Sequence, residues 1–344
     1  MTMTTVGIDL AKNVFQLHGV DQHGKTVLKK KLKRHQLSTF FANVEPCLIG
    51  MEACSGAHYW ARTLVNQGHT VKLMAPQFVK PYVKTNKNDA ADAEAICEAV
   101  TRPNMRFVSI KSPDQQALLS LHRARAGFIK TQTAQINQIR GLLTEFGIVL
   151  PTGKVAIHKH VPTILEDAEN ALPDTFRQVL SRLYDHLTEL SEHIEQFDQS
   201  LKAHFKHCEL SQRIASLPGI GLISATAIVG TIGDGSEFKN GRQLSAWLGL
   251  VPRQHSSGGK NILLGMSKRG DAYLRTLLIH GARSVLIARS HQVPPESWLG
   301  GLINRRNKNV AAVALANKNA RTLWAMLTRG EEYNPKRYPD AFAG

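Results

Sequence analysis

The sequence predicts an α/β domain followed by a mainly helical remainder within 344 residues. Three observations lead to this class. Short apolar runs separated by turns fill the chain up to residue 105, two stretches within 106–210 repeat apolar residues at helical spacing, and residues 211–344 combine Pro- and Gly-containing turns with apolar helical stretches. We therefore expect three domains, 1–105, 106–210 and 211–344.

The first apolar run, residues 4–12, carries a carboxylate, Asp9, at its end. Because side chains alternate along a strand, Val6 and Ile8 point to one face, and Gly7 and Asp9 point to the other. An acid in this position can bind a metal ion.

Two further β-like runs, 14–20 and 25–33, are joined by a Gly-containing hairpin connection, and a fourth run, 47–51, is followed by Glu52. The remaining elements are a helix near 35–43, a helix near 57–67 and a strand near 70–74. A three-stranded meander followed by helix, strand and helix is the order of the ribonuclease H-like fold. Two strand ends in this order carry acids.

Residues 86–100 predict a helix with Asn88 as N-cap and with Asp89 and Asp92 on one face. If this helix packs beside the sheet, four carboxylates converge: Asp9, Glu52, Asp89 and Asp92. Like charges at that distance repel, so a divalent cation would compensate them. Oxygen ligands favour Mg²⁺ or Mn²⁺ over zinc, and such sites often hold two metals that clamp a phosphodiester.

Two other interpretations of these acids stay open. Each acid can be an ordinary strand end, and the two aspartates can simply favour the positive N-terminus of their helix. The Gly-Ile-Asp start also occurs in the first phosphate loop of the actin and chaperone ATPases. That loop needs glycine after the aspartate, whereas Leu10, Ala11 and Lys12 follow here, and no second Asp-x-Gly-x-Gly loop appears.

The middle of the chain predicts an arm of two long helices. Apolar residues recur at helical spacing through 113–147, and through 174–206 they keep alternating steps of three and four for about four heptads, the coiled-coil period. Pro173 stands where the second helix would begin, and 150–172 reads as a turn or short helices. The period leaves open whether the seam closes within one chain or between chains; we expect the arm also to contribute to oligomerisation.

Charge is concentrated in the last third. The formal net charge is +16, and residues 211–344 contain 18 basic against 7 acidic residues. A field of this sign attracts polyanions such as nucleic acids. No apolar run approaches the roughly 18 residues of a membrane span and no secretory pattern is present, so we expect a cytoplasmic protein without membrane partners. The 4 cysteines lack zinc-site spacing.

The run Leu217-Pro218-Gly219-Ile220-Gly221 fits a helix-hairpin-helix element, in which Gly219 and Gly221 would let backbone N–H groups reach a phosphate. Such contacts bind the nucleic-acid backbone rather than its sequence. An ordinary turn between helices is the alternative.

A polar, glycine-bearing loop follows at 253–260, and it contains adjacent serines, Ser256 and Ser257. A serine here can bring its hydroxyl close to a phosphate, although such a stretch is more commonly a flexible loop. An apolar helix is expected at 273–288, and a helix with a basic face for contact with a nucleic-acid backbone is expected at 310–326. The candidate phosphate-binding side chains of this region are Arg253, Lys260, Lys268, Arg269, Arg305 and Arg306.

Taken together, the motifs GIDLAK, MEACSG, NKNDAADAEAI, LPGIG, GLVPRQHSSGGK and SKRGDAYLR resemble the DEDD transposases of bacterial insertion sequences. These form the insertion sequence one-ten family, and the sequence is most similar to its insertion sequence eleven-eleven branch. The similarity spans nearly the whole chain.

The resemblance implies a RuvC-like N-terminal domain, a coiled-coil connection and a C-terminal transposase domain. It also implies a recombinase that acts on donor and target DNA and is guided by an RNA encoded by its own element. We expect the protein to form a homo-oligomer, a dimer or a tetramer. By position, Asp9, Glu52, Asp89 and Asp92 would bind the metal. Ser257 would be the nucleophile; Ser256 is the neighbouring alternative and Ser267 a more distant one.

Two competing functions remain at this point. One is a RuvC-like junction nuclease that hydrolyses DNA with metal-activated water and without a serine. The other is a non-enzymatic nucleic-acid-binding protein built on the basic C-terminal part.

Overall fold

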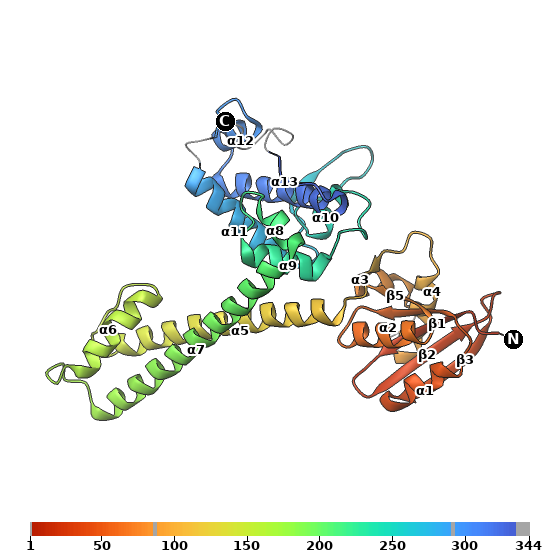
Figure 1. The fold of residues 1–344 in the computed structure, drawn as a ribbon, viewed down its shortest axis with the longest axis horizontal. Coiled ribbons are helices and arrows are strands. Elements are labelled where there is room, and N and C mark those ends of the chain that lie inside the picture. Colours follow the sequence, from red (N-terminus) through yellow and green to blue (C-terminus); the bar gives the residue numbers. More distant parts are fainter. Residues whose placement is uncertain (1, 85–87, 290–292, 335–344) are drawn as a thin grey trace. The chain divides into compact units, whose positions relative to one another are not determined.

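The computed structural model describes residues 2–84, 88–289 and 293–334. The chain divides into two compact units, Met1–Pro113 and Asp114–Gly344. The first is a mixed α/β unit and the second is almost entirely helical (Figure 1). The predicted class, α/β followed by a helical remainder, is therefore confirmed at this level.

A six-stranded mixed sheet forms the first unit, in the order β3-β2-β1-β4-β5-β6. The strands β1, β2 and β3 form an antiparallel meander, β4 and β5 run parallel to β1, and β6 is antiparallel to β5. The strand bounds are β1 Thr5–Leu10, β2 Val14–Val20, β3 Thr26–Lys33, β4 Leu48–Glu52, β5 Thr70–Met74 and β6 Phe107–Val108. The five strands expected from the sequence are present in the expected order along the chain, and the short β6 was not expected.

Helices cover both faces of this sheet. Val6 and Ile8 point toward α1 (Leu37–Ala42) and α2 (Ala57–Asn66), where they join a buried apolar cluster that includes Trp60. The opposite face packs against α4 (Asp89–Val100). Alternation along β1 therefore divides its side chains between two layers, as the sequence predicts. The remaining short helices are η1 Arg34–Gln36, α3 Pro76–Val79 and η2 Lys80–Tyr82.

The capping residue of α4 determines where that helix begins. The Asn88 side chain accepts a hydrogen bond from the Ala90 N–H at 3.0 Å, which satisfies one of the free N–H groups of the first turn. Asp89 is the first helical residue. The sequence predicted a helix over residues 86–100, and residues 86 and 87 lie outside the described ranges.

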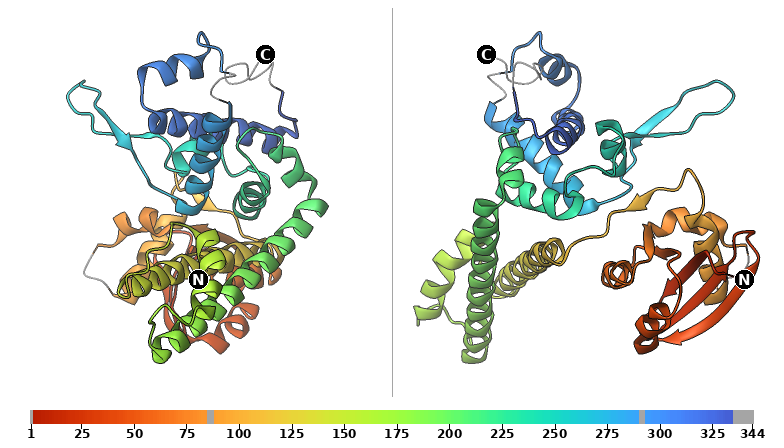
Figure 2. Two further views of the ribbon diagram at one scale, coloured as in Figure 1. Left: turned by 90° about the vertical axis from the view of Figure 1, so that its left-hand side faces the viewer. Right: turned by 45° about the vertical axis from the view of Figure 1, so that its right-hand side comes forward.

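In the second unit, two long helices lie side by side: α5 (Pro113–Thr144) and α7 (Asp174–His207) (Figures 1 and 2). They are antiparallel, because Arg125 pairs with Asp198 while Gln132, farther along α5, donates a hydrogen bond to Ser191, earlier in α7. The helix α6 (Lys154–Glu166) packs on the outer part of the pair through Ile157 and Val161. The seam between these two helices closes within one chain.

The base of the helix pair is tied to the C-terminal helices by a buried histidine. His122 of α5 shares hydrogen bonds with Thr226 of α9 and Tyr273 of α11, each at 3.1 Å. Burial lowers the pKa of His122 to about 4, so its ring is neutral at pH 7. The C-terminal elements are α8 Glu209–Ala215, α9 Leu222–Ile232, α10 Gly241–Trp247, β7 Pro252–Gln254, β8 Leu263–Met266, α11 Ala272–Arg289, α12 Trp298–Arg305 and α13 Lys308–Arg329.

The helices α8 to α13 enclose one large apolar core, and β7 and β8 form a separate two-stranded hairpin that extends away from these helices (Figure 2). The sequence interpretation treated this region as a loop. Among the described helices, none combines the length and the apolarity needed to cross a lipid bilayer.

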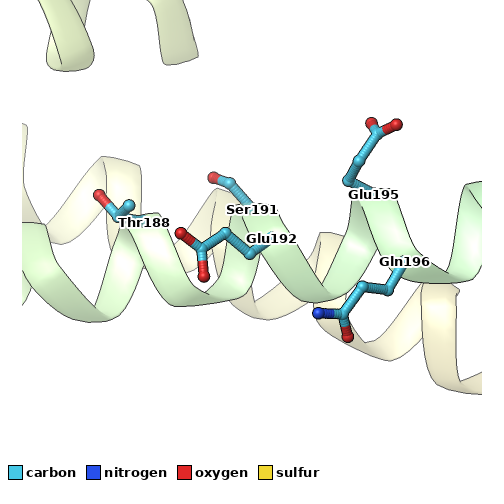
Figure 3. Close-up of a pocket in the computed structure, with 5 residues that line it drawn as sticks. All are labelled: Thr188, Ser191, Glu192, Glu195 and Gln196. Carbon is cyan, nitrogen blue, oxygen red and sulfur yellow. The ribbon is translucent and has the colours of Figure 1, made fainter.

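A shallow hollow lies along α7, lined by the polar side chains of one helix (Figure 3). Its lining residues are Thr188, Ser191, Glu192, Glu195 and Gln196. None of the predicted site residues belongs to it, and one helix face of polar side chains offers no convergent chemistry.

Candidate functional site

Two glycines let α4 approach the sheet closely. Gly7 of β1 and Gly50 of β4 are paired in the parallel register. A Cβ at Gly7 would lie 2.2 Å from the Ala93 carbonyl oxygen, and a Cβ at Gly50 would lie 2.8 Å from the Val100 Cβ. The backbone of α4 thus occupies the space that a side chain would fill at Gly7, and the Val100 side chain of α4 occupies it at Gly50.

The same two strands carry the acids two residues farther on. Asp9 follows Gly7 and Glu52 follows Gly50, so period-two alternation places both acids on the face that α4 covers. Because Gly7 and Gly50 are in register, Asp9 and Glu52 end neighbouring strands at the same level. The sequence interpretation did not use these glycines, yet the repeated Gly-x-acid pattern at two strand ends is a signal that could have identified them.

Three carboxylates meet where β1 ends and α4 begins. One oxygen each from Asp9, Asp89 and Asp92 can be chosen so that all three lie within 4.8 Å of one another. Asp89 is exposed, and the other two are partly buried. The helix N-terminus favours the two aspartates of its first turn.

Glu52 lies outside that group of three but within electrostatic range of it. Burial raises the pKa of the Glu52 carboxyl, and the charges of Asp9 and Asp92 raise it further. The cluster therefore consists of oxygen donors that repel one another, and a hard divalent cation is the partner that such a donor set fits.

We expect Glu52→Gln to separate stability from metal binding. A carboxyl whose pKa is raised in the folded state contributes stability at low pH and loses that contribution as pH rises through the folded value. Removing the charge should therefore raise the free energy of unfolding at pH 7 in metal-free buffer.

The stabilisation by Mg²⁺, in contrast, should be smaller in Glu52→Gln than in the wild type. Wild-type protein should gain about 2.7 kcal/mol at Mg²⁺ concentrations 100-fold above Kd. Glu52→Gln should gain less, and the wild-type gain should shrink as pH falls because protons compete for the carboxylates. Chemical denaturation at several pH values, with and without Mg²⁺, measures both effects. A Glu52→Gln protein less stable than wild type in metal-free buffer would contradict this account.

The adjacent serines lie at the tip of the β7–β8 hairpin. The Lys260 N–H donates to the Ser257 carbonyl at 3.0 Å, and Gly258 and Gly259 have φ of 54° and 78°. Positive φ at both central residues identifies a type I′ turn, which explains the two glycines. The sequence SSGGK therefore forms the turn of a β-hairpin.

The three candidate serines differ in their surroundings. The Ser256 hydroxyl accepts a hydrogen bond from the Ile262 N–H at 3.3 Å across the hairpin. Ser257 is exposed, and among the described residues its hydroxyl has no protein hydrogen-bond partner. The Ser267 oxygen is buried, which makes it inaccessible to a large substrate.

The predicted phosphate-binding residues all belong to the second unit. Gly219 has φ of 89° and packs against the Gly281 backbone of α11, whereas Gly221 is exposed at the N-terminus of α9. The predicted basic side chains are all exposed: Arg253, Lys260, Lys268, Arg269, Arg305 and Arg306. The acids thus gather in the first unit, and the serines and these basic residues lie in the second.

In comparisons with known proteins, the acids and the serines fall within two different family matches. Residues 6–148 match a transposase family model of the DEDD type, and residues 211–295 match the model described as the transposase IS116/IS110/IS902 family. A probable family 20 transposase of Pseudomonas aeruginosa is 50% identical over 337 residues, which cover 97% of this chain and 100% of that protein.

Two further relatives are nearly as similar. The transposase for insertion sequence element IS1111A of Coxiella burnetii is 46% identical over 95% of this chain and 90% of its own length. The transposase for IS1328 of Yersinia enterocolitica is 44% identical over 96% of this chain and 99% of its own length.

The fold, the acidic cluster and these matches define a transposase of the DEDD class. The chain belongs to the IS116/IS110/IS902 transposase family, with its similarity extending to the IS1111A protein. Membership implies cleavage and rejoining of DNA, and the DEDD class implies a divalent metal ion. The resemblance seen in the sequence is therefore confirmed.

Proposed function

We propose that this transposase is Mg²⁺-dependent and cleaves and rejoins DNA through a covalent phosphoserine at Ser257. The observation that carries the metal part is the convergence of Asp9, Asp89 and Asp92, with Glu52 beside them. Mn²⁺ would fit the same oxygen donors. A metal bound there would stabilise charge on the scissile phosphate and polarise the reacting oxygens.

In this proposal Ser257 makes and breaks the bonds to phosphorus. The Ser257 oxygen attacks the phosphorus, forming a serine–phosphate bond as the bond from phosphorus to the 3′ oxygen breaks. The proton leaves the serine hydroxyl, and a proton ends on the departing oxygen as a free 3′-hydroxyl. Because one phosphoester replaces another, the reverse attack rejoins strands without ATP.

Ser257 is preferred over its neighbours because of its surroundings. The Ser256 oxygen is engaged across the hairpin and the Ser267 oxygen is buried. Lys260, at the other end of the same turn, can offset phosphate charge. The acids and the serine belong to different compact units, so the proposal requires both to act on one phosphodiester of bound DNA, within one chain or between protomers.

The finer fold assignments are part of this proposal. The order β3-β2-β1-β4-β5, with β2 antiparallel and β4 and β5 parallel to β1, supports a RuvC-like domain in 1–105. The α5–α7 pair supports a coiled-coil arm in 106–210, and the turn between α8 and α9 supports a helix-hairpin-helix element in the transposase domain, 211–344.

The partners in this proposal are donor and target DNA, an element-encoded guide RNA and further copies of the chain as a dimer or tetramer. The exposed basic residues of the second unit would hold nucleic-acid backbone. The guide RNA is proposed from the family resemblance. Sequencing the nucleic acid that copurifies with the protein, alongside the DNA flanking the gene, tests that component.

Trapping the protein–DNA adduct tests the nucleophile. We expect Ser257→Ala to abolish the covalent adduct formed with DNA carrying the element's ends, whereas the matched variant Ser256→Ala should retain it. Denaturing gel electrophoresis with labelled DNA detects the adduct, and mass spectrometry of the adduct peptide locates it.

Other results of the adduct experiment would point to a different nucleophile or a different mechanism. An adduct lost only in Ser256→Ala would identify Ser256, and not Ser257, as the nucleophile. Full cleavage by both variants without any adduct would favour a RuvC-like nuclease that uses water. Restored activity on mixing Asp9→Asn with Ser257→Ala protein would indicate that different protomers supply the acids and the serine.

A further inference from the structure

The register of the sheet extends from the acidic cluster to a line of lysines on β3. Asp9 of β1 pairs with Gln16 of β2, and Gln16 pairs with Lys31 of β3. Residues paired across neighbouring strands project from the same face of a sheet. Lys31 therefore projects from the face that carries Asp9, two strands away or roughly 10 Å.

The same reasoning places two more lysines on this face. Lys29 pairs with His18, and His18 pairs with Gly7, the glycine that contacts α4. Lys33 is separated from Lys31 by one residue and so repeats the alternation. Lys29, Lys31 and Lys33 thus form a line with a spacing of roughly 6.7 Å.

This line lies on the edge strand of the sheet and is exposed. The helix α4 packs on β1, β2 and β4, and its Glu94 lies 4.0 Å from His18 and 3.9 Å from Lys84. All three lysines are exposed, and in the part of the chain that the structure describes none of them forms an ion pair. Three unpaired ammonium groups beside an acidic site provide a surface for a polyanion.

The adjacent Lys30 projects from the opposite face of the sheet, away from Asp9. Its ammonium lies 4.9 Å from the centre of the Phe40 ring, on the side of α1. Lysines on an edge strand also discourage pairing with other sheets, and Lys30 serves that purpose as well as its neighbours do. Protection of the edge therefore does not explain why three lysines share the face of Asp9.

We propose that Lys29, Lys31 and Lys33 bind the phosphate backbone of the DNA strand that leads into the acidic site. This inference rests on the proposed function, since the acids act on that strand. DNA is favoured over RNA because the lysines share a sheet face with the acids that cleave DNA. They would position the substrate and do not take part in the bond changes.

The test uses the salt dependence of DNA binding by the full-length protein, with a duplex carrying the ends of the encoding element. Each phosphate contact contributes about −0.9 to the slope of log Kobs against log salt. We expect Lys31→Gln to reduce the slope by about 0.9, and the variant with all three changed to glutamine to reduce it by about 2 to 3. The matched control Lys30→Gln should keep the wild-type slope.

Thermal unfolding verifies that each variant is folded, and cleavage by Asp9→Asn is measured in parallel. An unchanged slope in the triple variant, with cleavage lost in Asp9→Asn, overturns this inference and leaves the proposed function standing. An equal loss in Lys30→Gln overturns it as a general charge effect. A loss confined to structured RNA from the element assigns the lysines to RNA and also overturns it. If the triple variant reduces the slope but Asp9→Asn cleaves normally, DNA binding by the lysines is supported and the proposed function is contradicted.

Discussion

Asp9→Asn is expected to reduce the DNA cleavage rate by roughly 10³-fold, because a metal held by the acids would supply several kcal/mol of charge stabilisation. Asparagine keeps the size of the side chain and one oxygen, but it removes the negative charge that the cation requires. The stabilisation of the folded protein by Mg²⁺ should fall in the same variant. Timed cleavage of labelled DNA and chemical denaturation with and without Mg²⁺ measure the two effects.

Glu45→Gln provides the matched control, since Glu45 is an exposed acid of the same unit outside the cluster. Its cleavage rate and its response to Mg²⁺ should equal those of wild type. Wild-type cleavage by Asp9→Asn would remove the acids from the mechanism. Normal DNA binding without any cleavage by the wild-type protein would favour a purely nucleic-acid-binding role.

Gly7→Ala is expected to lower the free energy of unfolding by about 1–3 kcal/mol and to weaken the Mg²⁺ response together with cleavage. The added methyl group would lie 2.2 Å from the Ala93 carbonyl oxygen and 2.4 Å from the Cys97 nitrogen, both in the backbone of α4. Backbone atoms cannot move aside as a flexible side chain can. The helix must shift, and it carries Asp89 and Asp92 with it.

The same substitution at Gly127 should have the opposite sign. Gly127 is exposed on α5, and a Cβ there would meet no atom within 4 Å. Alanine should stabilise that helix by about 0.5–1 kcal/mol because it restricts the unfolded chain. Denaturant unfolding of both variants, with cleavage assayed under folded conditions, compares them directly. Unchanged stability and cleavage in Gly7→Ala would show that α4 does not depend on this close approach.

The sequence predicted the elements near the acids because each has a local signal. Asp9 and Glu52 follow short apolar runs, and Asn88 is a strong N-cap that determines where Asp89 and Asp92 begin their helix. The close approach at Gly7 has no such local cause. It depends on the packing of a helix about 90 residues later in the chain, which alternation in β1 alone cannot reveal.

The hairpin around Ser257 was missed for a different reason. Both strands are short and exposed, so they lack the alternation that identifies a half-buried strand. The turn itself had a readable signal, because two glycines between polar residues favour a type I′ connection. Likewise, the lysines of β3 became a group only when register showed which of them share a face with Asp9.

The antiparallel course of α5 and α7 has a consequence for how the arm can vary. The chain leaves the C-terminal core near His122 and returns to it through α8, so the outer turns of both helices lie beyond the fixed base. Removing facing segments of equal length from the two helices would bring the α6 end nearer while leaving the His122–Thr226–Tyr273 contacts intact. The length of the α5–α7 pair can therefore differ among relatives, or be changed by engineering, without a redesign of the C-terminal core.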